Sequence, residues 1–114
     1  MIVLPFPPSS LSGHAKGHWR SKAAETKRWR AWAHTAALAA KVAVPADGDI
    51  IVKVRFTPPN NRSDRTNFPN RMKPIFDGLA DALKVNDRRF VPAYEFCPAQ
   101  APGKVEIRVG GADQ

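Results

Sequence analysis

Two one-sided apolar patterns follow each other in the middle of the chain, and together they restrict its fold. Residues 49–57 alternate between an apolar face and a partly basic one, which predicts a half-buried β-strand. After Pro58-Pro59, apolar residues recur at helical spacing on one stripe, formed by Met72, Ile75, Phe76, Leu79 and Leu83. A strand and a helix that are each apolar on one side must pack against another element, so we expect a two-layer domain.

The flanking segments extend this pattern to an α+β fold. We expect a short strand at residues 2–4, an alanine-rich helix from Lys22 to about Ala43, and strands near 94–97 and at 104–109. The order β-α-β-α-β-β predicts a small mixed sheet with two helices on one face. Pro74 either opens the second helix or kinks one that begins near Asn67. At 114 residues, the chain is expected to form a single domain, 1–114.

Cysteine content and apolar run lengths bear on the cellular compartment. The single Cys97 cannot form an intramolecular disulfide. The apolar opening, residues 1–6, is too short for a signal peptide, and no apolar run is long enough for a membrane span. We therefore expect a cytoplasmic protein without a membrane partner.

The positive charge is large and clustered. The formal net charge is +8 and the isoelectric point is about 10.3. Seven of the Lys and Arg residues fall between His14 and Lys41, with Glu25 as the one acid there. Such clustering favours a nucleic-acid partner, and a basic surface without such a partner is the alternative.

Acidic residues recur inside the basic stretch from Arg62 to Arg89. They are Asp64, Asp77, Asp81 and Asp87, with Lys73 among them. Carboxylates on a basic surface are typical of a Mg²⁺ site that meets a phosphate. The helix and its return loop could bring Asp64 and Asp87 to one edge of the sheet. Simpler interpretations remain: a charge ladder for Lys73, Asp77 and Asp81, a helix cap for Asp64 and a turn for Asp87.

The same stretch carries a family resemblance. The segments DRTNFPNRMKPIFDGLADAL and NDRRF, with the opening LPFPPSS, resemble the RusA-type endodeoxyribonucleases, the Holliday junction resolvases often carried by phages and prophages. The resemblance covers nearly the whole chain. It implies a Mg²⁺-dependent homodimer, with Mn²⁺ as a substitute metal, that binds four-way DNA junctions and makes paired symmetric nicks.

The resemblance also implies roles for individual residues. Asp64 and Asp87 match the metal-binding aspartates, Lys73 the active-site lysine, and Asn67 and Asp77 possible further ligands. Thr66 and Asn86 stand where the family pattern has aspartates. Because neither side chain is anionic, the metal site has fewer carboxylates than the pattern, and a catalytically weakened or inactive junction-binding protein on the same fold is the alternative.

Further residues are candidates for DNA contact. Arginines flank the acids, and a second basic region precedes and enters the first helix. Phe68 is a candidate wedge between bases, and Trp29 and Trp32 are expected to pack in the core or a dimer interface. The basic candidates are Arg62, Arg65, Arg71, Arg88 and Arg89 around the acids, and Lys16, Arg20, Lys22, Lys27, Arg28 and Arg30 in the second region. A basic structural or RNA-associated protein without a metal site is a third possibility.

Overall fold

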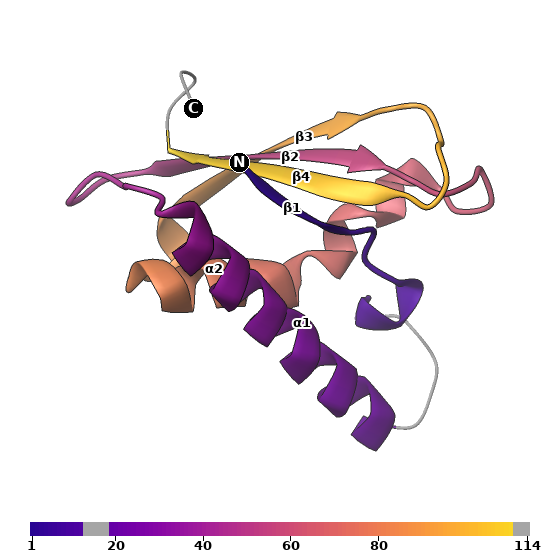
Figure 1. Cartoon of the computed structure of the whole chain (residues 1–114), viewed down its shortest axis with the longest axis horizontal. Coiled ribbons are helices and arrows are strands. Elements are labelled where there is room, and N and C mark those ends of the chain that lie inside the picture. Colours follow the sequence, from indigo (N-terminus) through magenta and orange to yellow (C-terminus); the bar gives the residue numbers. More distant parts are fainter. Residues whose placement is uncertain (13–18, 111–114) are drawn as a thin grey trace.

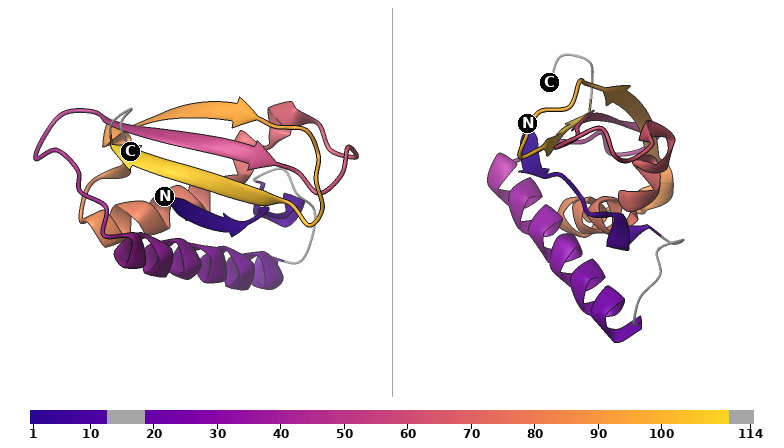
Figure 2. Two further views of the ribbon diagram at one scale, coloured as in Figure 1. Left: turned by 45° about the horizontal axis from the view of Figure 1, so that its top comes forward. Right: turned by 90° about the vertical axis from the view of Figure 1, so that its right-hand side faces the viewer.

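A four-stranded mixed sheet forms one layer of the protein and two α-helices form the other (Figures 1 and 2). The computed structural model describes residues 1–12 and 19–110. Both helices lie on the same face of the sheet, so the predicted α+β class and element order are confirmed. The elements are β1 (Ile2–Pro5), α1 (Trp19–Ala40), β2 (Ile50–Thr57), α2 (Lys73–Leu83), β3 (Phe90–Phe96) and β4 (Lys104–Gly110).

The sheet order is β1-β4-β2-β3, and its directions decide where the loops lie. β4 is antiparallel to both β1 and β2, whereas β2 and β3 are parallel, with Ile50 opposite Phe90 and Phe56 opposite Phe96. A parallel pair needs a crossover connection, and α2 supplies it. The end of β2 and the start of β3 therefore lie at opposite ends of the two strands.

The alternating pattern of β2 packs one side of the sheet into the core. Ile50, Val52, Val54 and Phe56 are each at most 1 % exposed, whereas the intervening side chains face solvent on the uncovered face of the sheet. The α2 stripe meets this buried side, and Met72, Ile75 and Leu79 have no exposed surface. The core is thus the expected layer between strand and helix.

The bounds of α1 and β3 differ from the sequence predictions, and the position of Pro74 decides between the two predicted alternatives. α1 begins at Trp19 and ends at Ala40, about three residues earlier at each end than predicted. Pro74 lies in the first turn of α2, where its missing N–H costs no helical hydrogen bond, so it opens the helix. β3 begins at Phe90, ahead of the predicted start, because an edge strand tolerates Pro92.

Gly78 lets α2 approach α1 closely. A Cβ at this position would lie 2.8 Å from the Ala33 Cβ and would also meet the Arg30 carbonyl oxygen. Ala33 and Ala37 have almost no exposed surface, so small residues line the crossing from both sides.

We predict that Gly78→Ala destabilises the fold by about 1–3 kcal/mol, the usual range for overpacking, despite alanine's higher helix propensity. Chemical denaturation measures the change, with exposed Ala39→Ser as the control. Unchanged or increased stability of Gly78→Ala would contradict the close helix crossing.

Candidate functional site

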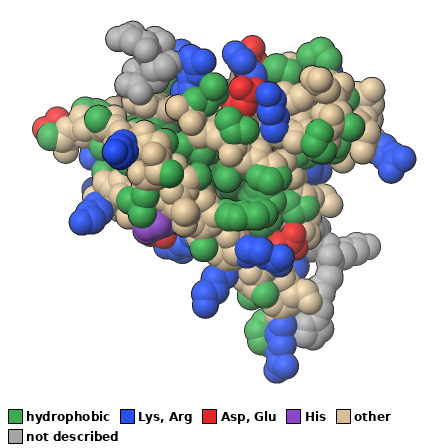
Figure 3. Space-filling view, viewed as in Figure 1, with side chains coloured by type: hydrophobic (Ala, Val, Ile, Leu, Met, Phe, Trp, Pro, Cys, Tyr) green, Lys and Arg blue, Asp and Glu red, His purple; other side chains and the backbone are tan. Residues whose placement is uncertain are grey.

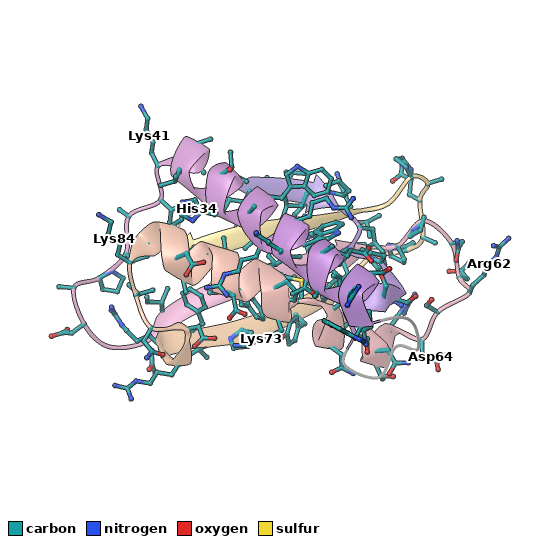
Figure 4. The ribbon with its side chains drawn as sticks, turned by 90° about the horizontal axis from the view of Figure 1, so that it is seen from below. His34, Lys41, Arg62, Asp64, Lys73 and Lys84 are labelled. Atoms are coloured by element: carbon teal, nitrogen blue, oxygen red, sulfur yellow. The ribbon has the colours of Figure 1, made fainter. Side chains whose placement is uncertain are left out.

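Lys73 lies between two carboxylates at the start of α2. Its Nζ is 2.6 Å from Asp87 Oδ2 and 2.9 Å from Asp77 Oδ1. The helix repeat places Asp77 one turn after Lys73, and the loop before β3 brings in Asp87. Figure 4 shows Lys73 beside α2, on the flank of the molecule. We call Lys73, Asp77 and Asp87 the lysine–aspartate cluster.

Charge pairing favours the ionised forms of Lys73 and Asp87. Hydrogen bonds to Asp87 and then to Asp77 raise the pKa of Lys73 above its ordinary value. The hydrogen bond from Lys73, followed by its positive charge, lowers the pKa of Asp87. Both carboxylates are partly exposed, and Lys73 is mostly exposed, so ions and phosphates in solution can reach them.

The loop that carries Asp87 is held by its neighbours. Asn86 Oδ1 accepts a 2.9 Å hydrogen bond from the Arg88 N–H, which caps the short turn Asp87–Arg89. Arg89 donates to the carbonyl oxygens of Gly48 and Pro45, at 2.7 and 2.8 Å. Asn86 therefore shapes the turn, and Arg89 ties it to the loop before β2.

A second ion pair borders the lysine–aspartate cluster. Arg30 of α1 donates to both oxygens of Asp81, at 2.6 and 2.9 Å, and this contact lowers the pKa of Asp81. The predicted ladder is therefore correct for Lys73 with Asp77 and wrong for Asp81, which pairs with the other helix. The Arg30–Asp81 ion pair and the lysine–aspartate cluster line one open depression of about 300 Å³.

Asp64 does not join the lysine–aspartate cluster. It follows β2, whereas Asp87 precedes the parallel strand β3, so the two aspartates lie at opposite ends of these neighbouring strands. Asp64 lines a separate depression with Arg65 and Thr66, and Figure 4 shows it close to Arg62 and away from Lys73. Asn67, on the turn that follows Asp64, is also exposed. The expectation that Asp64 and Asp87 meet at one edge was wrong for a single chain.

The lysine–aspartate cluster contains two carboxylates that are suitable ligands for a metal ion. Within residues 1–12 and 19–110, no group of three or more His, Cys, Asp or Glu side chains is arranged to hold a metal ion. Asp77 and Asp87 nevertheless converge on one cation, the Lys73 ammonium. Two carboxylates with water completing the shell suit Mg²⁺, so this donor set fits one such ion.

Two candidates for DNA contact are buried and were predicted wrongly. Arg71 is 6 % exposed, donates to the Pro7 carbonyl oxygen, and lies over the rings of Phe6 and Phe68. Burial also lowers its pKa. Phe68 is 1 % exposed and packs against Phe6 and Phe56. Both residues belong to the core, because the turns before α2 fold back onto the sheet.

The other basic candidates remain on the surface. Arg62 and Arg65 are exposed near Asp64, Arg88 is exposed beside Asp87, and Lys27 and Arg28 are exposed on α1. Lys22 and Arg89 are half-buried, and Lys16 lies outside the described residues. Lys and Arg side chains border the face shown in Figure 3 and surround a hydrophobic area. As expected, Trp29 is in the core, whereas Trp32, which packs edge-on against it, is 46 % exposed and does not belong to the core of the chain.

Comparison with known proteins finds a relative of this chain. No family model matches the chain. An uncharacterized protein of Xylella fastidiosa is 35 % identical over 119 residues, an alignment that covers 99 % of this chain and 77 % of the relative. The chain belongs to the family of this protein. The similarity extends over both helices and the candidate site.

Across the described ranges, neither α1 nor α2 is long and apolar enough to cross a bilayer.

We predict that Lys73→Met raises the pKa of Asp87 toward its ordinary value of 3.8. The lowered pKa means that the pair stabilises the fold above that value, and that this stabilisation is lost as the pH falls through the folded-state pKa. Carboxyl NMR titration measures the shift. Arg30→Met is the matched control, because it removes the partner of Asp81 alone. An unchanged pKa of Asp87 in Lys73→Met would contradict the pairing.

Proposed function

We propose that the protein is a Mg²⁺-dependent endonuclease that cuts branched DNA at four-way junctions and acts as a homodimer. The observation that carries the proposal is the lysine–aspartate cluster, a solvent-accessible pair of carboxylates around one lysine on a strongly basic chain. The resemblance of residues 62–89 to RusA-type resolvases supports the same reaction. A DNA substrate places the proposed activity in the cytoplasm.

The proposed cleavage gives each residue of the lysine–aspartate cluster a separate role. Asp77 and Asp87 would hold the metal, which supplies an activated water and stabilises charge on the departing oxygen. Lys73 stays protonated because its pKa is raised. Its ammonium can leave the carboxylates and donate to a non-bridging phosphate oxygen, which stabilises the charge that develops there. Asp87 stays ionised at neutral pH because its pKa is lowered.

Binding energy would come from the cations around the cluster. Arg88 is exposed next to Asp87, and Lys27 and Arg28 are exposed on α1, which packs against α2. Contacts of this kind neutralise phosphates and release counterions. They also offset the repulsion between DNA and the aspartates.

The salt dependence of junction binding tests this part of the proposal. We predict a steep loss of affinity with salt, and a log–log slope that falls by about two units in the Lys27→Ala/Arg28→Ala variant. Fluorescence anisotropy with a labelled four-way junction measures both slopes. A flat salt response of the unchanged protein would exclude DNA as its partner.

Cleavage of a labelled four-way junction in Mg²⁺ and Mn²⁺ tests the catalytic role. We predict paired nicks in opposing strands, reduced by at least about a hundredfold in Asp87→Asn, because a metal ligand is removed. Junction binding should survive. Asp47→Asn changes an exposed acid in the loop before β2 and serves as the control. Full cleavage by Asp87→Asn would contradict the assignment of the site.

A catalytically inactive junction-binding protein is the second candidate. It is favoured by Lys73 itself, since its ammonium neutralises the two carboxylates that a metal would need. Asn86, which caps its own turn, supplies no further anionic ligand. This candidate predicts equal junction binding in chelator and in Mg²⁺, with no cleavage in either metal.

A further inference from the structure

A depression of about 200 Å³ lies where the loops after β1 and β2 meet the turn before β4. Five prolines line it, together with Phe6, Phe68 and Arg71, and we call it the proline pocket. β1, β2 and β3 all end on this side of the molecule, and β4 begins there (Figure 1). None of its lining residues belongs to the lysine–aspartate cluster, so it is a separate site.

Arg71 is the one charged residue among the described residues that line the proline pocket. It is only 6 % exposed. Its Nη1 donates to the Pro7 carbonyl oxygen at 3.1 Å, whereas its buried Nε finds no acceptor among the described residues. Its Cζ lies 5.6 Å from the centre of the Phe6 ring and 5.2 Å from that of Phe68. Two aromatic faces thus stand where a carboxylate usually pairs with a buried arginine.

This environment is unfavourable for a cation unless an anion joins it. A guanidinium stays protonated at neutral pH, and although burial lowers the pKa of Arg71, no acid of the described residues raises it. A buried charge without an opposite charge, and a buried donor without an acceptor, both cost stability. The two rings offset part of this cost through cation–π contact. An anion in the proline pocket would supply the missing charge and the missing acceptor together.

The size and the walls of the proline pocket restrict that anion. Its volume is below the range of about 300–1,000 Å³ that is usual for drug-sized ligands, so the ligand has to be small. Proline and phenylalanine rings offer apolar surfaces against which a planar ring packs well. A single arginine balances a monoanion, whereas a phosphate monoester carries a charge of about −1.5 to −2. Asn60 and Ser63 are exposed at the rim and add neutral polar groups.

We propose that the proline pocket binds a small aromatic monocarboxylate, whose carboxylate pairs with Arg71 and whose ring packs against the prolines and Phe68. A carboxylate accepts charge-assisted hydrogen bonds from a guanidinium, and these are among the stronger ones in proteins. The prolines fix the backbone on both sides of the pocket, so little conformational freedom is lost when the ligand enters. This binding site does not depend on the proposed nuclease function.

NMR titration of the isotope-labelled protein with benzoate tests the ligand class, with benzamide as an uncharged control of the same shape. We expect benzoate to shift the amide signals of Ser63, Phe68 and Arg71 saturably. We also expect it to bind at least about tenfold more tightly than benzamide, because the carboxylate alone pairs with Arg71. Inorganic phosphate and thymidine monophosphate should bind more weakly than benzoate. Equal binding of benzoate and benzamide, or shifts confined to other residues, would overturn the site, and tighter binding of either phosphate would overturn the monocarboxylate.

Substitution of Arg71 tests its role in the proline pocket. Arg71→Met removes the charge and keeps the length of the side chain, so it should abolish the preference for benzoate over benzamide. Arg62→Met removes an exposed cation of the neighbouring loop and is the matched control, which should keep that preference. Circular dichroism shows whether each variant is folded, and the titration of the unchanged protein decides the proposal if Arg71→Met does not fold. A preference that persists in folded Arg71→Met, or that Arg62→Met abolishes, would place the carboxylate on surface cations and overturn the proposal.

Discussion

The parallel pairing of β2 with β3 is the constraint on which the site depends. It requires a crossover, which α2 provides, and it separates the end of β2 from the start of β3 by the length of the sheet. Lys73 and Asp77 come with the crossover helix, and Asp87 comes with the start of β3. One backbone arrangement thus brings these three side chains together and excludes Asp64 from the same place.

The sequence predicts the local elements well because each has its own periodicity. The alternation in β2 and the stripe in α2 identified the buried side chains, and the spacing of Lys73 and Asp77 predicted their contact. The relative direction of β2 and β3 is a property of the whole sheet and leaves no local pattern. For this reason the sequence wrongly predicted that Asp64 lies near Asp87. Arg71 was predicted on the surface because its side chain is charged, and its place in the core was missed.

The position of Lys73 links fold stability to the proposed chemistry. In the free protein its ammonium satisfies two carboxylates that would otherwise repel each other, so the site is formed before any ligand arrives. A metal held by Asp77 and Asp87 would have to displace this ammonium, and in the proposed reaction the freed Lys73 would donate to the phosphate. Asn86 stands where the RusA-type pattern has a carboxylate, so under the proposed function this competition would separate an active nuclease from an inactive junction-binding protein.

The proposed nuclease requires that Asp77 and Asp87 hold a divalent metal. Titration of the labelled protein with substoichiometric Mn²⁺, followed by NMR, tests this requirement, because bound Mn²⁺ broadens nearby signals. We predict that the amides of Asp77, Asn86 and Asp87 broaden first, and that the Asp77→Asn/Asp87→Asn variant loses this effect. Uniform broadening, or broadening that persists in the variant, would show that the lysine–aspartate cluster binds no metal.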